Sequence, residues 1–149
     1  IEECPVPVVA AVQGFAFTGA LEVLVAADIV LAGETAYFQD THAKLGLVPT
    51  WGGNVRLPRR IGLHRAKELM FTCRRFSAQD ACDWGLVNRV VPDAELLAEA
   101  WKLADEIAAN SRSSIEKQKR MMTDAAAHSQ YDALRWTTRF HPGHGDDMK

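Results

Sequence analysis

The sequence predicts an α/β fold in which short buried strands give way to a mostly helical second half. Two runs of apolar and β-branched residues, PVPVVAAV (5–12) and DIVLAG (28–33), have the composition of strands buried on both faces of a parallel sheet. The segment ALEVLVAA (20–27) between them is typical of a short helix. Strand, helix and strand in this order indicate a layered α/β architecture.

Further elements are predicted from turn residues and hydrophobic spacing. Ser77 and Asp80 have capping-box spacing at the start of a helix, and Gly85 follows where such a helix ends. The other predicted elements are a glycine-rich turn at 13–19, a strand at 35–38, loops and short helices at 46–62, a helix at 63–72 and a strand at 86–91.

After residue 92 the sequence is predicted to be helical, with Asp93 as the N-cap of the first helix. The predicted helices cover residues 93–110, 114–127 and 131–140. The domain prediction is therefore a core of strands and helices at 1–92, followed by a helical C-terminal region at 93–149.

The composition limits the partners and the location that we expect. The 149 residues suffice for one domain with a buried core, and 48% hydrophobic with 24% charged residues is typical of a globular protein. A net charge of −2 gives no reason to expect nucleic acid or an anionic membrane as a partner, and no apolar run reaches the roughly 20 residues that cross a bilayer. Three cysteines without ligand-like spacing favour a reduced, cytoplasmic location.

The first residues are expected to lie inside a longer protein. The chain lacks an initiator Met and begins almost at a predicted core strand. Its first residues include two glutamates and no basic segment, so they do not resemble a secretory signal.

Several common site motifs do not fit the sequence. Gly14 and Gly19 have P-loop spacing, but Ala-Leu follows where Lys-Ser/Thr is required, and neither GxGxxG after a strand nor GxSxG occurs. His141 and His144 lack further clustered ligands, so no metal site is expected there. The arginines between positions 56 and 75 are interpreted as a solvated face, and most of the four tryptophans as packing residues.

Glu22 is unusual because it is a carboxylate within the apolar run that follows the glycine-rich turn. If a helix begins at Gly19, the free N–H groups of its first turn suit a developing oxyanion, and Glu22 lies in that same turn. An N–H donor beside a carboxylate suits proton transfer next to a carbonyl group. Alternatively, Glu22 only offsets the helix dipole.

Three motifs carry a resemblance to the enoyl-CoA hydratase/isomerase (crotonase) superfamily, in the family's order and spacing, over nearly the whole chain. They are PVPVVAAVQGFAFTGALEVLVAADIVLAGETAYF, KLGLVPTWGGNVRLPRRIG and FSAQDACDWGLVNRVVP. The resemblance implies a spiral of ββα repeats, present here in part, with a helical C-terminal region that packs subunits into homo-trimers or hexamers. It also implies acyl-CoA thioester substrates and no separate cofactor, because coenzyme A is part of the substrate.

The resemblance also implies roles for individual residues. Gly19 resembles the glycine that supplies the second oxyanion-hole N–H, and Glu22 resembles the first of the two catalytic glutamates of the hydratases. Thr50 resembles the position whose backbone N–H helps to orient water. The residues expected to contact substrate are Ala16, Thr18, Asp40, Thr50, Trp51 and Gly52.

This sequence departs from the family pattern in two ways. The second catalytic glutamate of hydratases lies in a pattern like F-G-x-P-E, whereas FQDTHAKLG places His42 there. His42 can supply the second acid–base function, since imidazole titrates near neutral pH, or it is a hydrogen-bonded turn residue. The family's upstream half, which carries the other oxyanion-hole N–H and much of the CoA-binding surface, is also missing from the sequence.

The leading functional hypothesis is a lyase that adds water to a 2-enoyl-CoA to give a 3-hydroxyacyl-CoA, in fatty-acid or related acyl-CoA metabolism. His42 keeps a second hypothesis open, namely another reaction on the same scaffold, such as double-bond isomerisation, hydrolysis or decarboxylation of an acyl-CoA. A third hypothesis is a catalytically silent fragment or pseudo-enzyme that retains only assembly surfaces.

Overall fold

The computed structural model describes residues 1–140, Gly143 and Asp147, and the chain forms two compact units. One unit, here called the core unit, comprises Val9–Lys102. The other, here called the helical unit, combines Ile1–Val8 with the chain from Leu103 onward. The domain boundary predicted after residue 92 stays a prediction.

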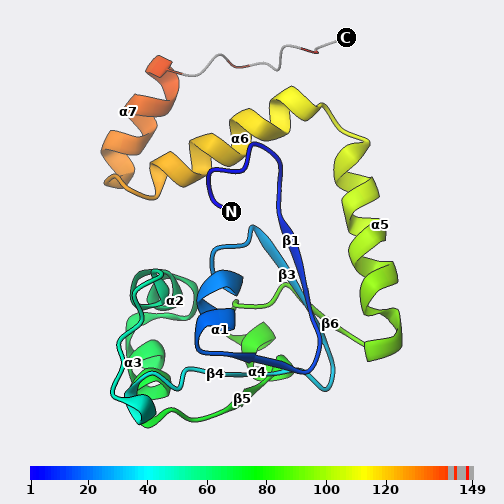
Figure 1. Ribbon diagram of the computed structural model, residues 1–149. Helices are drawn as coiled ribbons and strands as arrows, with labels where there is room; N and C mark the ends of the chain where they lie inside the picture. The colour runs from blue at the N-terminus through cyan, green and yellow to red at the C-terminus, as the bar shows by residue number, and fades with distance from the viewer. Residues whose placement is uncertain (141–142, 144–146, 148–149) are drawn as a thin grey trace. The chain divides into compact units, whose positions relative to one another are not determined.

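The strands of the described residues form two sheets in the core unit (Figure 1). The first sheet has the order β1-β3-β6 and is parallel throughout. In the second sheet, of order β2-β4-β5, β2 and β4 are parallel and β5 is antiparallel to β4. The strands are β1 (Val9–Val12), β2 (Phe15–Phe17), β3 (Ile29–Gly33), β4 (Tyr37–Gln39), β5 (Phe76–Ser77) and β6 (Arg89–Val91).

Helices follow pairs of strands, which gives the ββα repeat that the family resemblance implies. The chain passes from β1 in one sheet to β2 in the other and then to α1, and it repeats this path through β3, β4 and α2. The α/β fold class and the helical C-terminal region are thereby confirmed. The helices are α1 (Gly19–Leu24), α2 (Gly53–Ile61), α3 (Leu63–Thr72), α4 (Ala78–Asp83), α5 (Leu96–Ala108), α6 (Arg112–Ala125) and α7 (Gln130–Phe140), with 3-10 turns η1 (Ala43–Leu45) and η2 (Asp93–Glu95).

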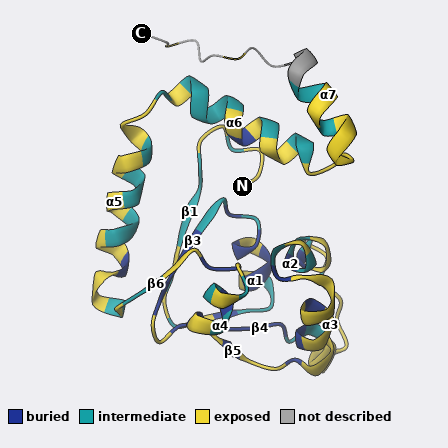
Figure 2. Cartoon of the chain, turned by 180° about the vertical axis from the view of Figure 1, so that it is seen from behind, coloured by how far each residue is buried: buried dark blue, intermediate teal, exposed yellow. Residues whose placement is uncertain are grey.

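The buried centre of the core unit explains why the strand sequences are so apolar. Val30, Leu31 and Ala32 in β3 are almost completely buried, as the dark blue segment in Figure 2 shows. In the second sheet, Phe38 is fully buried and its ring stacks on that of Phe76, with 5.3 Å between centroids. Burial on both faces removes the polar alternation of a half-exposed strand.

Two local predictions differ from the structure, and one short strand was not predicted. The predicted turn at 13–19 contains strand β2, because Gly14, with φ 69°, turns the chain sharply and Phe15–Phe17 then pairs with β4. The two-residue strand β5 was not predicted. Asp93 is not a helix N-cap: its carboxylate accepts hydrogen bonds from the backbone N–H and hydroxyl of Thr35, and a 3-10 turn precedes α5.

In the helical unit, Lys119 of α6 binds the N-terminal segment Ile1–Val8. Its side chain is buried, and Nζ donates hydrogen bonds to the carbonyl oxygens of Ile1 at 3.1 Å and Val6 at 3.0 Å. The predicted helices at 114–127 and 131–140 correspond to α6 and α7, while His141 and His144 lie outside the described residues. None of the helices in the described ranges combines the length and the apolar composition that crossing a membrane requires.

Helix α4 begins with the capping box that the sequence predicts. The Ser77 hydroxyl accepts from the backbone N–H of Asp80 at 3.0 Å, while the Asp80 carboxylate accepts from the Ser77 hydroxyl and backbone N–H. These donors, led by the hydroxyl, hold the pKa of Asp80 below its ordinary value.

We expect Ser77→Ala to lower the free energy of unfolding by about 1 kcal/mol at neutral pH, because the cap and the carboxylate's main donor are lost. The pKa of Asp80 is lower in the folded state, so its stabilisation is present above the unfolded pKa and disappears as pH falls. Urea titrations should therefore show the difference between the two proteins shrinking below about pH 4. The exposed neighbour Gln79, changed to Ala, is the control and should alter stability by less than about 0.5 kcal/mol.

Candidate active site

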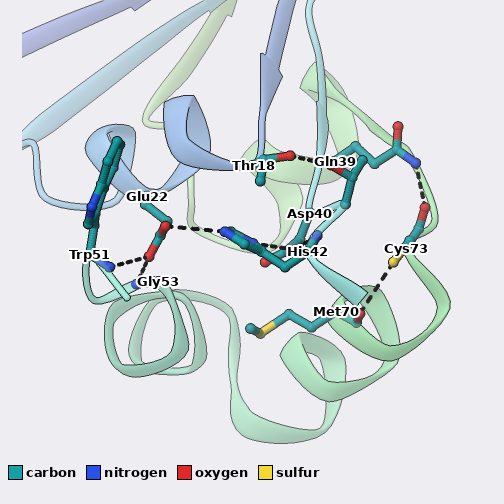
Figure 3. Close-up of polar contacts among 10 residues, drawn as sticks. Thr18, Glu22, Gln39, Asp40, His42, Trp51, Gly53, Met70 and Cys73 are labelled. Carbon is teal, nitrogen blue, oxygen red and sulfur yellow. Dashed lines mark hydrogen bonds and ion pairs between the residues drawn. The ribbon is translucent and has the colours of Figure 1, made fainter. Parts of the chain in front are cut away.

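Glu22 is a buried carboxylate in the first turn of α1, and it lies at the centre of a polar cluster in the core unit (Figure 3). Its side chain retains only 4% of its accessible surface. The residue before the helix, Thr18, has φ 52°, which is unusual for a β-branched residue and turns the chain abruptly from β2 into α1. A carboxylate this deeply buried requires hydrogen-bond partners.

Two backbone N–H groups hold one oxygen of Glu22. Oε1 accepts from the N–H of Trp51 and from the N–H of Gly53, both at 2.9 Å. Gly53 is the first residue of α2, so this helix begins against the carboxylate. A Cβ at position 53 would lie 2.9 Å from Cγ of Glu22, so only glycine allows so close an approach.

His42 faces the other oxygen of Glu22, with 3.4 Å between Nε2 and Oε2. On its opposite side, the imidazole Nδ1 lies 2.8 Å from Oδ1 of Asp40, and the backbone N–H of His42 donates to the same oxygen at 2.9 Å. Asp40 and His42 are buried like Glu22. The three side chains therefore form a continuous chain, carboxylate to imidazole to carboxylate, which Figure 3 displays.

The pairing of β2 with β4 brings these residues together. The strands are parallel and adjacent, so their carboxyl ends meet at one edge of the sheet, with Thr18 after β2 and Asp40 after β4. The Thr18 N–H donates to the carbonyl of Gln39 at 2.9 Å, and a hydrogen bond joins the hydroxyls of Thr18 and Thr41. These contacts align the start of α1 with residues 40–42.

Gly19 and Trp51 lie beside this cluster. Gly19 begins α1, and within the described part of the chain its N–H has no hydrogen-bond acceptor, as expected for a first-turn N–H. The ring of Trp51 covers the Cα of Gly19, because a Cβ there would lie 3.0 Å from ring atom Cζ3. Trp51 is 67% exposed, so the ring also borders solvent.

The remaining residues predicted to contact substrate have different surroundings. Ala16 is buried in β2, where it pairs with Phe38 of β4. Thr50 is exposed, and Gly52, with φ 97°, forms the turn into α2. Asp40 lies behind the His42 ring as seen from Glu22. The substrate contacts of all these residues stay predictions.

Two features of the cluster were not predicted from the sequence. Gly53 donates to Glu22, whereas its neighbours Thr50, Trp51 and Gly52 were the residues predicted to contact substrate; the signal was the Gly-Gly pair itself. The side chain of Gln39 is buried, and its Nε2 donates to the Cys73 carbonyl at 2.6 Å, linking β4 to the end of α3. No simple sequence pattern indicates a contact of this kind.

The comparisons with known proteins agree with this fold. The sequence profile of the enoyl-CoA hydratase/isomerase family matches residues 1–144. The protein therefore belongs to the enoyl-CoA hydratase/isomerase family. Among curated proteins, carnitinyl-CoA dehydratase from Proteus mirabilis is 45% identical over 102 residues, which is 68% of this chain, and that from Salmonella typhi is 46% identical over 101 residues.

Solved structures show the same relationship. An enoyl-CoA hydratase from Bacillus anthracis superimposes with a TM-score of 0.90 at 37% identity, covering 93% of this chain and 54% of that one. An enoyl-CoA hydratase/isomerase from Cupriavidus metallidurans has a TM-score of 0.87 at 33% identity, covering 92% and 52%. The alignments to the two dehydratases span 39% of their length, so the chain corresponds to only part of its relatives.

We expect Gly53→Ala to displace the Glu22 carboxylate, because the new Cβ would overlap Cγ of Glu22 and the buried side chain has little room to move. The free energy of unfolding should fall by about 1–3 kcal/mol. Amide resonances of Trp51 and of position 53 should shift as their hydrogen bonds to Glu22 lengthen. Asn54→Ala, at the exposed next position, is the control; equal effects of the two changes would contradict the proposed close packing.

Proposed function

We propose that this protein adds water to, or removes it from, an acyl-CoA thioester, interconverting a 2-enoyl-CoA and a 3-hydroxyacyl-CoA. The observation that carries the proposal is the buried pair of Glu22 and His42, with 3.4 Å between Oε2 and Nε2. Membership of the enoyl-CoA hydratase/isomerase family and the likeness to dehydratases of a CoA thioester support it. Coenzyme A enters as part of the substrate, and no separate cofactor is invoked.

In the hydration direction, one group must take a proton from water and another must protonate C2 of the acyl chain. Glu22 as the carboxylate accepts the proton of water while the oxygen bonds to C3, and the double-bond electrons move toward the thioester carbonyl. The N–H of Gly19 stabilises the resulting enolate oxygen. His42 as the imidazolium then donates its proton to C2. The product thus gains a hydroxyl group at C3 from water and a hydrogen at C2 from His42.

The contacts of Glu22 suit the role of base in this scheme. The N–H groups of Trp51 and Gly53 hold Oε1, which fixes the plane of the carboxylate and leaves Oε2 for the proton. Such preorganisation avoids rearrangement of the side chain during the reaction. The exposed Trp51 ring beside Gly19 offers an apolar surface for an acyl chain, which agrees with its predicted contact with substrate.

We expect Glu22→Gln to reduce turnover of crotonyl-CoA at least 10²-fold, because Gln keeps an oxygen for the two N–H donors but cannot accept the proton of water. Mass spectrometry measures the gain of one water by the thioester, using the 149-residue chain and any longer product of its gene. Binding of the thioester, followed by calorimetry, should persist in the variant.

Glu34→Gln changes an exposed glutamate and is the matched control. Normal turnover by Glu22→Gln, or no thioester binding by the unmodified protein, would contradict the proposal. Incubation with a 3-enoyl-CoA separates the alternatives on the same scaffold: a product of unchanged mass with the double bond moved identifies an isomerase instead.

We also propose that the helical C-terminal region joins copies of this chain into a trimer or hexamer. Large apolar side chains are exposed on α5, α6 and α7, and such residues favour burial at an interface. They are Leu97, Trp101, Met122, Tyr131 and Leu134. Light scattering on the purified protein should give three or six times the mass of one chain, and a monomer at micromolar concentration would contradict this proposal.

A further inference from the structure

We propose that Asp40 is a positioning residue that fixes the tautomer of His42, so that His42 and Glu22 share a single proton. This inference rests on the proposed function for its catalytic meaning, but it is carried by the contacts of the three buried side chains. It gives Asp40 a role different from the substrate contact expected from sequence.

Asp40 determines which ring nitrogen of His42 carries hydrogen. The backbone N–H of His42 donates to Oδ1 of Asp40, and this same oxygen lies 2.8 Å from Nδ1. Because Oδ1 already acts as the acceptor for the backbone N–H, it is oriented to accept a second hydrogen from the ring. Nδ1 is therefore the donor, and a neutral His42 has its lone pair on Nε2.

The remaining contact then requires one more proton. Nε2 faces Oε2 of Glu22 at 3.4 Å, and two lone pairs facing each other in a buried site repel. A proton between them turns repulsion into attraction, whether it resides on Nε2 or on Oε2. Oε1 of Glu22 cannot be its site, because two backbone N–H groups donate to that oxygen.

The shared proton resets the site after each turnover. Before hydration, Glu22 is a carboxylate and His42 an imidazolium. After Glu22 has taken a proton from water and His42 has given one to C2, Glu22 is protonated and His42 is neutral. Transfer of that proton from Oε2 to Nε2 restores the starting state, so no proton is gained or lost by the pair.

Nuclear magnetic resonance of the ring nitrogens tests this directly in the 149-residue chain labelled with ¹⁵N. We expect Nδ1 of His42 to carry hydrogen throughout the neutral pH range. In Asp40→Ala, neutral His42 should change to the Nε2–H tautomer. Asp40→Asn should keep the Nδ1–H tautomer, because the backbone N–H of residue 42 orients the amide oxygen toward the ring. The exposed His64 serves as the reference in the same spectra.

Kinetics supply the second readout. Asp40→Ala should lower kcat roughly 10²-fold while KM changes little, because acid–base transfer is impaired and binding is not. Asp40→Asn should have a smaller effect on kcat. Asp83→Ala, which removes an exposed carboxylate of α4, is the matched control and should change neither kcat nor the His42 spectrum.

The outcomes distinguish the two proposals. An Nε2–H tautomer in the unmodified protein, or an unchanged tautomer in Asp40→Ala, overturns the role of Asp40 whatever the enzyme's activity. The expected spectra without turnover of any enoyl-CoA support the tautomer assignment and contradict the proposed function. The expected spectra together with normal kcat in Asp40→Ala overturn the positioning role.

Discussion

The placement of the Glu22 carboxylate in the core unit is the constraint on which the surrounding structure depends. A carboxylate with 4% exposure is costly unless each oxygen is satisfied, and here three elements provide the contacts. The loop before α2 and the first residue of α2 donate to Oε1, while the segment after β4 presents His42 to Oε2. Removal of any one of these elements leaves the buried carboxylate with fewer partners, so the site and the fold of this region are not separable.

The segment from Gln39, the last residue of β4, to His42 also holds this arrangement in place. Four consecutive residues each make a contact to another element or to each other: Gln39 to the end of α3, Asp40 to His42, Thr41 to Thr18 and His42 to Glu22. Because β2 and β4 are paired in parallel, the same segment also determines where α1 begins. A short strand of three residues thus positions Glu22 and His42 through contacts at its carboxyl end.

The sequence was sufficient for the class of fold, and it singled out Glu22, because both depend on local patterns; the roles of the site residues stay predictions. Buried β-branched runs identified β1 and β3, the Ser77–Asp80 spacing identified the start of α4, and Glu22 was evident as a charge in an apolar run. The division of strands between two sheets was not predictable in the same way, because β2 and β5 are short and are defined by partners far away in sequence. The contacts of Gly53 and His42 with Glu22 also depend on such long-range pairing.

The presence of Asp40 offers a physical reason why His42 can occupy the position that, by the family resemblance, corresponds to a second glutamate. Two carboxyl groups that share one proton have a net charge of −1. A carboxylate and an imidazole that share one proton have a net charge of zero, which alters the field around a developing enolate. The carboxylate of Asp40, 2.8 Å from Nδ1, returns the buried group to −1 while also orienting the ring. Under the proposed function, the charge and the proton count of a two-glutamate site are retained, and the proton donor becomes an imidazolium.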